Sequence, residues 1–108
     1  MNVREFSWSP SEKKAARTAF DAAFSRECDA IRREVEARLG RSANPPDLWR
    51  VHDYLSEKRR DVDRKYDYRY SVLIAVFGTL LREQWITEKD LSELRPDKVE
   101  AIKIIASL

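Results

Sequence analysis

The chain has 108 residues, which is enough for one domain with a core of modest size. Charged residues make up 37% of it and glycine occurs only twice, a composition that favours helices and disfavours a turn-rich β-sandwich. The net charge of +2 is too small to indicate non-specific binding to nucleic acid or to an anionic membrane. We therefore expect a single all-α domain spanning residues 1–108.

The sequence lacks the marks of a secreted, membrane-spanning or zinc-binding protein. Its one cysteine, Cys28, excludes an intramolecular disulfide and suits a reducing, cytoplasmic location. Residues 1–10 lack the apolar core of a signal peptide, and the longest apolar run, Val72–Phe77, is too short to span a bilayer. The one histidine, His52, lies 24 positions from Cys28, so the two cannot make a structural zinc site. We expect neither a metal nor another cofactor.

A long first helix is predicted from Ser9 onward. Ser9 can cap it, a proline suits its first position, and Glu12 completes a capping box. It continues to Gly40, a residue typical of helix ends, which makes it roughly 30 residues or about 45 Å long. Its apolar stripe has spacings of three or four residues and consists of Ala16, Phe20, Phe24, Cys28, Ile31, Val35 and Leu39. One small chain cannot cover so long a stripe, so we expect a second copy against it, with Ile31 and Val35 at the interface.

A second helix follows the short loop of residues 41–46. Asn44 can cap this helix, and the prolines after it suit the first helical positions. The charged stretch Asp61–Arg69 is expected to contain a bend. The apolar stripe of the second helix consists of Leu48, Val51, Leu55, Val62 and Tyr66.

The last third of the chain contains its most apolar stretch, Tyr70–Leu81. Its β-branched content fits a buried strand as well as a buried helix, and periodicity does not distinguish the two. Because no second convincing strand exists to pair with it, we predict a helix that runs to about Trp85. Thr87 opens a short helix. A last helix starts near Pro96 and places four residues at core spacing, namely Val99, Ile102, Ile105 and Leu108.

Two polar features of the second helix are candidate sites. His52 and Asp53 project about 100° apart on a helix, so Asp53 is poorly placed to orient the imidazole. The chain also lacks a Gly-rich phosphate loop and a nucleophile elbow, so we predict that it is not an enzyme. Aspartates interrupt the basic residues at 58–65, which is typical of a solvated, ion-paired helix face. A small nucleic-acid-binding protein is the alternative from another functional class.

The face of the second helix that carries Trp49 has two interpretations. Trp49, Asp53, Ser56 and Arg60 fall within about 60° of one another, and His52 and Arg59 lie between them and the aliphatic stripe. A tryptophan with charged neighbours is typical of a protein–protein hot spot. The same pattern arises when the tryptophan belongs to the core and the polar residues are solvated. The residue pattern alone favours neither interpretation.

The ordered residues from Leu48 to Val72 resemble the central motif of the cyanobacterial fluorescence recovery protein family. The stretches that carry this resemblance are DLWRVHDYLSEKR and DVDRKYDYRYSV. The segments SWSPSE near the N-terminus and DKVEAIK in the last helix extend the resemblance over nearly the whole chain.

The resemblance implies an all-α homodimer with a tail at residues 1–8, a stalk at about residues 9–66 and a compact head at about residues 67–108. Members of this family are not enzymes. They bind the photoactivated orange carotenoid protein through its C-terminal domain, speed its return to the orange form and end phycobilisome quenching. The location implied is cytoplasmic, or peripheral at thylakoid membranes in a cyanobacterium. The motif assigns Leu48 to the dimer interface, and it assigns to the partner-binding surface Trp49, His52, Asp53 and Arg59.

Two positions depart from the family pattern. Cyanobacterial members have a bulky aromatic residue where this chain has Ala75, and a lysine where it has Ala101. Both positions belong to the head surface of the family. The resemblance therefore supports the scaffold and the dimer more strongly than the carotenoid-protein partner. A fluorescence-recovery-like protein that serves another partner is the alternative within the binding class.

Overall fold

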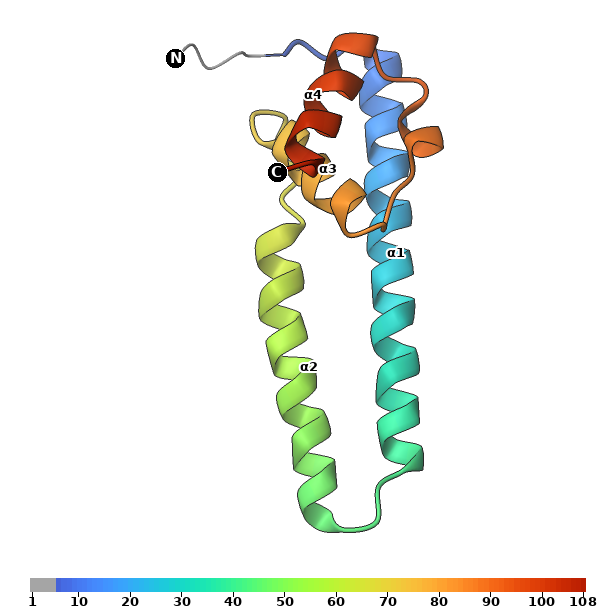
Figure 1. Ribbon diagram of the computed structural model, residues 1–108, viewed down its shortest axis with the longest axis vertical. Coiled ribbons are helices and arrows are strands. Elements are labelled where there is room, and N and C mark those ends of the chain that lie inside the picture. Colours follow the sequence, from blue (N-terminus) through green and yellow to red (C-terminus); the bar gives the residue numbers. More distant parts are fainter. Residues whose placement is uncertain (1–5) are drawn as a thin grey trace.

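A computed structural model describes residues 6–108, which form four α-helices and one short 3-10 helix and contain no strand (Figure 1). The all-α expectation is confirmed, and the apolar stretch at 70–81 is largely helical. Residues 1–5 of the predicted tail lie outside the described residues. The elements in chain order are α1 (Pro10–Gly40), α2 (Pro45–Lys65), α3 (Leu73–Arg82), η1 (Glu88–Leu91) and α4 (Pro96–Ala106).

Helix α1 is the spine of an elongated molecule. The molecule measures 53 × 28 × 23 Å and has a Cα radius of gyration of 16.9 Å, whereas a compact chain of this length has about 13 Å. The carboxyl half of α1 runs beside α2 as a two-helix hairpin, while α3, η1 and α4 gather around its amino half (Figure 1). From here on, the stalk is the part in which α1 and α2 lie side by side, residues 24–65, a narrower range than the 9–66 that the resemblance implies, and the head is the rest of the described chain.

The start of α1 follows the predicted capping chemistry. Ser9 Oγ accepts a hydrogen bond from the Glu12 N–H, and the Glu12 carboxylate accepts one from the Ser9 N–H, both at 3.2 Å. Glu12 is also buried, and it accepts further hydrogen bonds from the Arg95 N–H at 3.0 Å and from Lys98 Nζ at 3.1 Å. The capping residue therefore also joins α1 to the start of α4.

The core lies in the head, where α1 meets α3, η1 and α4. The largest fully buried apolar side chains in it are Leu73, Phe77, Leu80, Ile86, Leu91 and Ile102. The amino half of α1 contributes mainly small residues to the same cluster, namely Ala15, Ala16, Ala19 and Ala23. Small side chains at a helix contact shorten the distance between helix axes, so α1 can lie close to the head helices.

The predicted bend lies between α2 and α3, where the backbone leaves the helix at Tyr66 and has no regular structure through residue 69. Alternate side chains of this segment pack on α1. The Tyr66 ring lies edge-on to Phe20 and Phe24, with centroids 5.4 and 5.3 Å away, and Tyr68 lies 4.8 Å from Phe20. Edge-to-face pairs of this kind add to the energy of burial and fasten the segment to α1.

Three expectations about helix capping and the last helix are wrong. Helix α1 ends at Gly40 as predicted, but Gly40 does not adopt the left-handed conformation of a glycine cap. Asn44 occupies the N-cap position of α2 without a capping hydrogen bond from its side chain, and Asp47 instead accepts the Ala43 N–H at 3.1 Å. Leu108, which was assigned to the core, is 86% exposed because it lies beyond the last turn of α4.

Helix α3 is shorter than predicted and ends at Arg82 rather than near Trp85. The chain turns at Gln84, whose φ of 67° is left-handed. The Trp85 N–H bonds to the Leu80 carbonyl at 2.9 Å, and the Gln84 N–H bonds to the Leu81 carbonyl at 3.1 Å. This is the Schellman arrangement, which usually places glycine at the left-handed position. The glutamine at that position conceals the helix end from sequence analysis.

Candidate partner-binding surface

Three residues assigned to the partner-binding surface lie together on the exposed side of α2, namely Trp49, His52 and Asp53. Trp49 is 63% exposed, and the ring of His52 lies edge-on to it with centroids 6.4 Å apart. His52 Nδ1 lies 3.4 Å from Asp53 Oδ1. Both groups are exposed, and a contact of this length is too weak to fix the imidazole. The arrangement offers an aromatic and charged surface rather than a catalytic pair.

Arg59 lies six residues beyond Asp53, or about 9 Å along the helix. Its Nε donates to both carboxylate oxygens of Asp63, at 2.9 and 3.1 Å. This hydrogen bonding raises the pKa of Arg59 above its ordinary value. Both side chains are exposed, so the pair orients the guanidinium without burying it. Among the described residues, the terminal nitrogens of Arg59 make no hydrogen bond, which leaves them available to a partner.

The stalk exposes apolar side chains along both of its helices. Leu48, next to Trp49, is 51% exposed. Ile31 and Val35 are only partly covered by α2. The other large apolar side chains of the stalk that are substantially exposed are Phe24, Leu39 and Leu55. The single chain therefore leaves the predicted seam open along much of its length.

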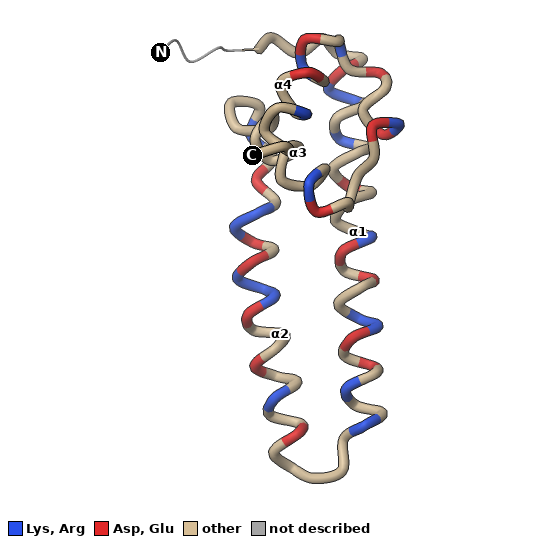
Figure 2. Tube along the Cα trace, in the orientation of Figure 1, with Lys and Arg blue, Asp and Glu red and all other residues tan. Residues whose placement is uncertain are grey.

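Much of the basic cluster of α2 is paired with acidic residues, as predicted. Arg64 contacts Asp61 at 3.3 Å, in addition to the pair formed by Arg59 and Asp63. Figure 2 shows acidic and basic residues alternating along α2 without a continuous basic stripe. A nucleic-acid backbone would meet carboxylates at every turn of this face.

A buried charge cluster at the junction of stalk and head was missed by sequence reasoning. Lys65 Nζ lies 2.8 Å from Glu27, 2.7 Å from Glu83 and 3.4 Å from Asp61, and its side chain is only 7% exposed. The Tyr66 hydroxyl also donates to Glu27, at 2.8 Å. The local sequence gave no signal for this cluster, since a lysine within a charged stretch is normally solvated.

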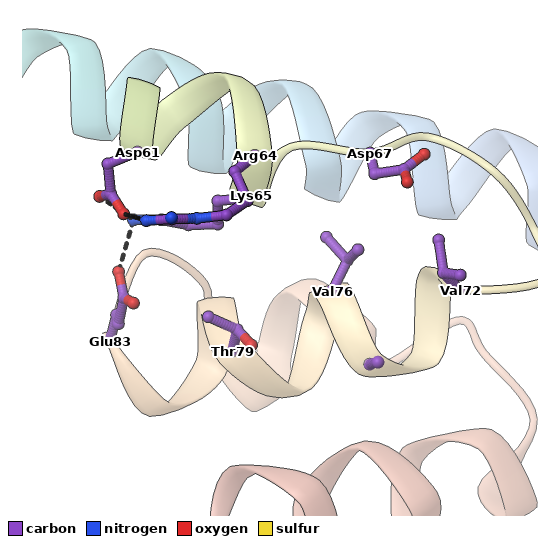
Figure 3. A pocket seen from close by; sticks show the side chains of 9 residues that line it. Asp61, Arg64, Lys65, Asp67, Val72, Val76, Thr79 and Glu83 are labelled. Carbon is purple, nitrogen blue, oxygen red and sulfur yellow. Dashed lines mark hydrogen bonds and ion pairs between the residues drawn. The ribbon is translucent and has the colours of Figure 1, made fainter. Parts of the chain in front are cut away.

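A groove of about 380 Å³ lies beside Lys65, between the end of α2 and α3 (Figure 3). The figure shows charged side chains on the α2 side, an apolar floor on α3, and the contact between Lys65 and Glu83 that bridges the two helices. Ala75, one of the two positions that depart from the family pattern, is exposed and lines this groove, whereas Ala101 is partly buried on α4. The remaining lining residues are Asp61, Arg64, Asp67, Val72, Val76 and Thr79.

Neither a metal centre nor a membrane span is found in the part of the chain that the structure describes. Residues 6–108 contain no group of three His, Cys, Asp or Glu side chains that could hold a metal ion. None of their helices is both long and apolar enough to cross a bilayer.

Comparison with known proteins identifies the same relatives by sequence and by structure. Residues 8–106 match the model of the family described as photoprotection regulator fluorescence recovery protein. The chain is 39% identical over 108 residues to the fluorescence recovery protein of Synechocystis sp. PCC 6803, covering 100% of this chain and 99% of that one. The solved structure of the protein from that organism has a TM-score of 0.90 at 40% identity, and that from Fremyella diplosiphon has 0.89 at 38% identity. Each comparison covers 94% of this chain and 100% of the solved one.

Proposed function

Because the chain belongs to the fluorescence recovery protein family of photoprotection regulators, we propose that it is a non-enzymatic regulator of the orange carotenoid protein. It binds the photoactivated form, mainly through the C-terminal domain of that protein, and accelerates the return to the resting orange form. This ends quenching at the phycobilisome. The observation that carries the proposal is the exposure of Trp49 beside exposed His52 and Asp53 on a helix face that the core of this chain does not use.

The proposed mechanism is differential binding. A ligand shifts a conformational equilibrium only when it prefers one of the two states. To accelerate reversion, the chain must also bind the transition state of that change more tightly than the photoactivated state that it first meets. A flat indole and two differently charged side chains, Asp53 and Arg59, supply contacts that depend strongly on the geometry of the facing surface.

The proposal includes a homodimer built along the stalk. Leu48 of α2 and the partly covered Ile31 and Val35 of α1 lie on apolar stripes that one chain leaves partly exposed. A second copy that covered these apolar side chains would stabilise the assembly by about 25 cal/mol for each Å² of apolar surface removed from water. It would also bring a second set of motif residues into the same particle.

The alternative is the same scaffold with a different protein partner, and it is favoured by one observation. Ala75 lines the groove beside Lys65, where an aromatic side chain in cyanobacterial members would present a much larger apolar surface. Large aromatic side chains carry much of the energy at protein interfaces. The loss of such a side chain, together with the alanine at position 101, would weaken a head contact while leaving the stalk motif intact.

A reversion assay tests the proposed function directly. The purified chain is mixed with photoactivated orange carotenoid protein in the dark, and the loss of the red form is followed by absorbance. We expect the rate to rise with the concentration of the chain and then to saturate, and to return to the basal rate with Asp53→Leu. Asp21→Leu is the matched control, since Asp21 is also exposed, lies on α1 in the head and forms an ion pair with Arg17. A basal rate with the folded, dimeric wild-type chain would contradict the proposal and favour another partner.

A further inference from the structure

The carboxyl end of α2 is joined to the rest of the chain by the buried Val62, by the aromatic contacts of Tyr66 and by a cluster of charged groups around Lys65. Val51 and Val62 are the buried residues of α2, while Leu48 and Leu55 are substantially exposed. Helices α3 and α4, in contrast, pack extensively on each other and share the core with α1. Helix α2 therefore has much less apolar attachment than the head helices have.

One ammonium group holds together carboxylates from three parts of the fold. Glu27 belongs to α1, Asp61 to α2 and Glu83 to the end of α3, and each contacts Lys65. Burial alone would lower the pKa of Lys65, but hydrogen bonds to Glu27 and Glu83 raise it overall, so this ammonium stays protonated. Without it, like charges would face one another in partly buried surroundings. Removal of Lys65 therefore turns attraction between three elements into repulsion.

The Glu83 carboxylate, which accepts from Lys65 on the head side, is held in place by the turn at the end of α3. The left-handed Gln84 reverses the chain directly after Glu83, and the indole Nε1 of Trp85 donates to the Glu83 carboxylate at 3.1 Å. Glu83 is therefore positioned by backbone and side chain together. Lys65 supplies the matching group on α2, as the bridging contact in Figure 3 shows.

The segment after Lys65 is suited to act as a hinge. Residues 66–69 have no regular structure and 70–72 form a turn, so a few backbone torsions can absorb a change in direction. Phe77 and the other central residues of the head core belong to elements that do not include α2. Tyr66 and Tyr68 pack against the edge of this core, so movement of the end of α2 disturbs that edge and leaves the centre of the core in place.

We propose that Lys65 is a latch that fixes the end of α2 to the head, and that opening the latch releases α2 and the hinge without unfolding the head. With the latch closed, Trp49 is held at a fixed distance from the head surface. With the latch open, α2 is still attached to α1 through the buried valines, the stacking of Arg38 on the Tyr54 ring at 4.1 Å and the contacts of Tyr66. Buried ion pairs often fix one arrangement of packed elements rather than adding much net stability, and we assign that role to Lys65. The proposal is independent of the identity of the partner.

Hydrogen–deuterium exchange of the full chain, resolved along the sequence, tests the latch. Lys65→Met removes the ammonium, and Glu83→Gln removes only the negative charge with which the head attracts Lys65. Glu83 is partly exposed and Lys65 keeps Glu27 in that variant, so the fold persists. The matched controls are Lys103→Met and Glu88→Gln, which break an exposed ion pair of 3.2 Å within the head.

We expect amides in residues 58–72 to exchange about fivefold faster or more in both latch variants, since local opening sets their exchange rate. Residues 73–106 should keep the wild-type rates, and both control variants should match the wild type throughout. Equal exchange in latch and control variants would overturn the proposal. So would faster exchange spread evenly over α1, α3 and α4, because the cluster would then contribute only to global stability.

Discussion

Ile105 of α4 packs directly against the bare backbone of Gly78 in α3. A Cβ built on Gly78 would lie 2.3 Å from Cγ2 and 2.7 Å from Cβ of Ile105, both far inside van der Waals contact. The two helices of the head therefore approach more closely than any side chain at position 78 would permit. The other glycine, Gly40, has no atom within 4 Å of the same built position.

These two glycines make a matched pair for a stability measurement. Gly78→Ala should lower the free energy of unfolding by about 1–3 kcal/mol, because the methyl group forces α3 and α4 apart. Gly40→Ala should raise it by about 0.5–1 kcal/mol, since alanine has the better helix propensity and meets open space. Urea denaturation followed by circular dichroism measures both. Similar effects of the two substitutions would show that the helix crossing is not the constraint.

Gln84→Gly should stabilise the fold. A left-handed conformation costs an L-residue about 1–2 kcal/mol and costs glycine almost nothing, while glycine gains entropy in the unfolded chain. We expect a net gain of about 0.5–1 kcal/mol, seen as a rise of a few degrees in Tm. Gln84→Ala is the control and should give no gain. A lower Tm for the glycine variant would mean that the glutamine side chain stabilises the turn.

Leu48→Glu should convert the proposed dimer into monomers at micromolar concentration. A carboxylate at the stalk seam would be buried without a partner, which costs several kcal/mol. Sedimentation velocity measures the change. Leu108→Glu is the matched control, since Leu108 is highly exposed at the opposite end of the molecule and should leave the assembly unchanged. A wild-type chain that sediments as a monomer under these conditions would rule out the proposed dimer.

Asp53→Leu and Arg59→Leu should remove function and spare the fold. Both side chains are largely exposed, with accessibilities of 76% and 80%, so each substitution should change stability by no more than about 0.5 kcal/mol. Helicity, Tm and dimerisation should match the wild type, while acceleration of partner reversion disappears. If both variants unfold or dissociate, the motif serves the structure rather than a partner surface.

Acid should weaken the junction of α1 and α4 through Glu12. Burial alone would raise its pKa, but the Arg95 N–H, Lys98 and the Ser9 N–H lower it from 4.5 to about 2. A carboxyl with a lowered pKa stabilises the fold above its unfolded value, so this contribution is lost as pH falls from 4.5 towards 2. Glu12→Gln should be less stable at neutral pH and should lose less stability over that interval. Parallel acid-denaturation curves for the two proteins would refute this.

The starts of α1 and η1 were predictable from the sequence because capping chemistry is local, whereas Asn44 does not cap α2. Ser9 with Glu12, and Thr87 with Asp90, form the capping boxes that their spacing predicts. The buried charges were not predictable in the same way. Lys65 pairs with a glutamate 38 positions away and Lys98 with one 86 positions away, and nothing near either lysine distinguishes it from a solvated one.

The candidate surface was only half predictable from the residues themselves. A helical wheel separates Trp49 from the aliphatic stripe by His52 but does not tell whether the indole is covered, since that depends on where α1 lies. The structure shows that α1 covers Val51 and Val62 and leaves Trp49 exposed. The role of the motif came from the resemblance to relatives and stays a prediction. The groove at Ala75 was not predictable, because it is formed where α2 and α3 meet and no local sequence pattern encodes the angle between them.

Because Trp49 is exposed, its intrinsic fluorescence can report on what binds the stalk. Trp8 lies 5.1 Å from the ammonium of Lys98, and Trp85 is hydrogen-bonded to Glu83, so both indoles have fixed neighbours in the head. Indole emission moves to shorter wavelength when water leaves the ring. A protein that docks on α2 would therefore shift the emission of the unlabelled chain, and one that docks only on the head would leave the Trp49 component unchanged.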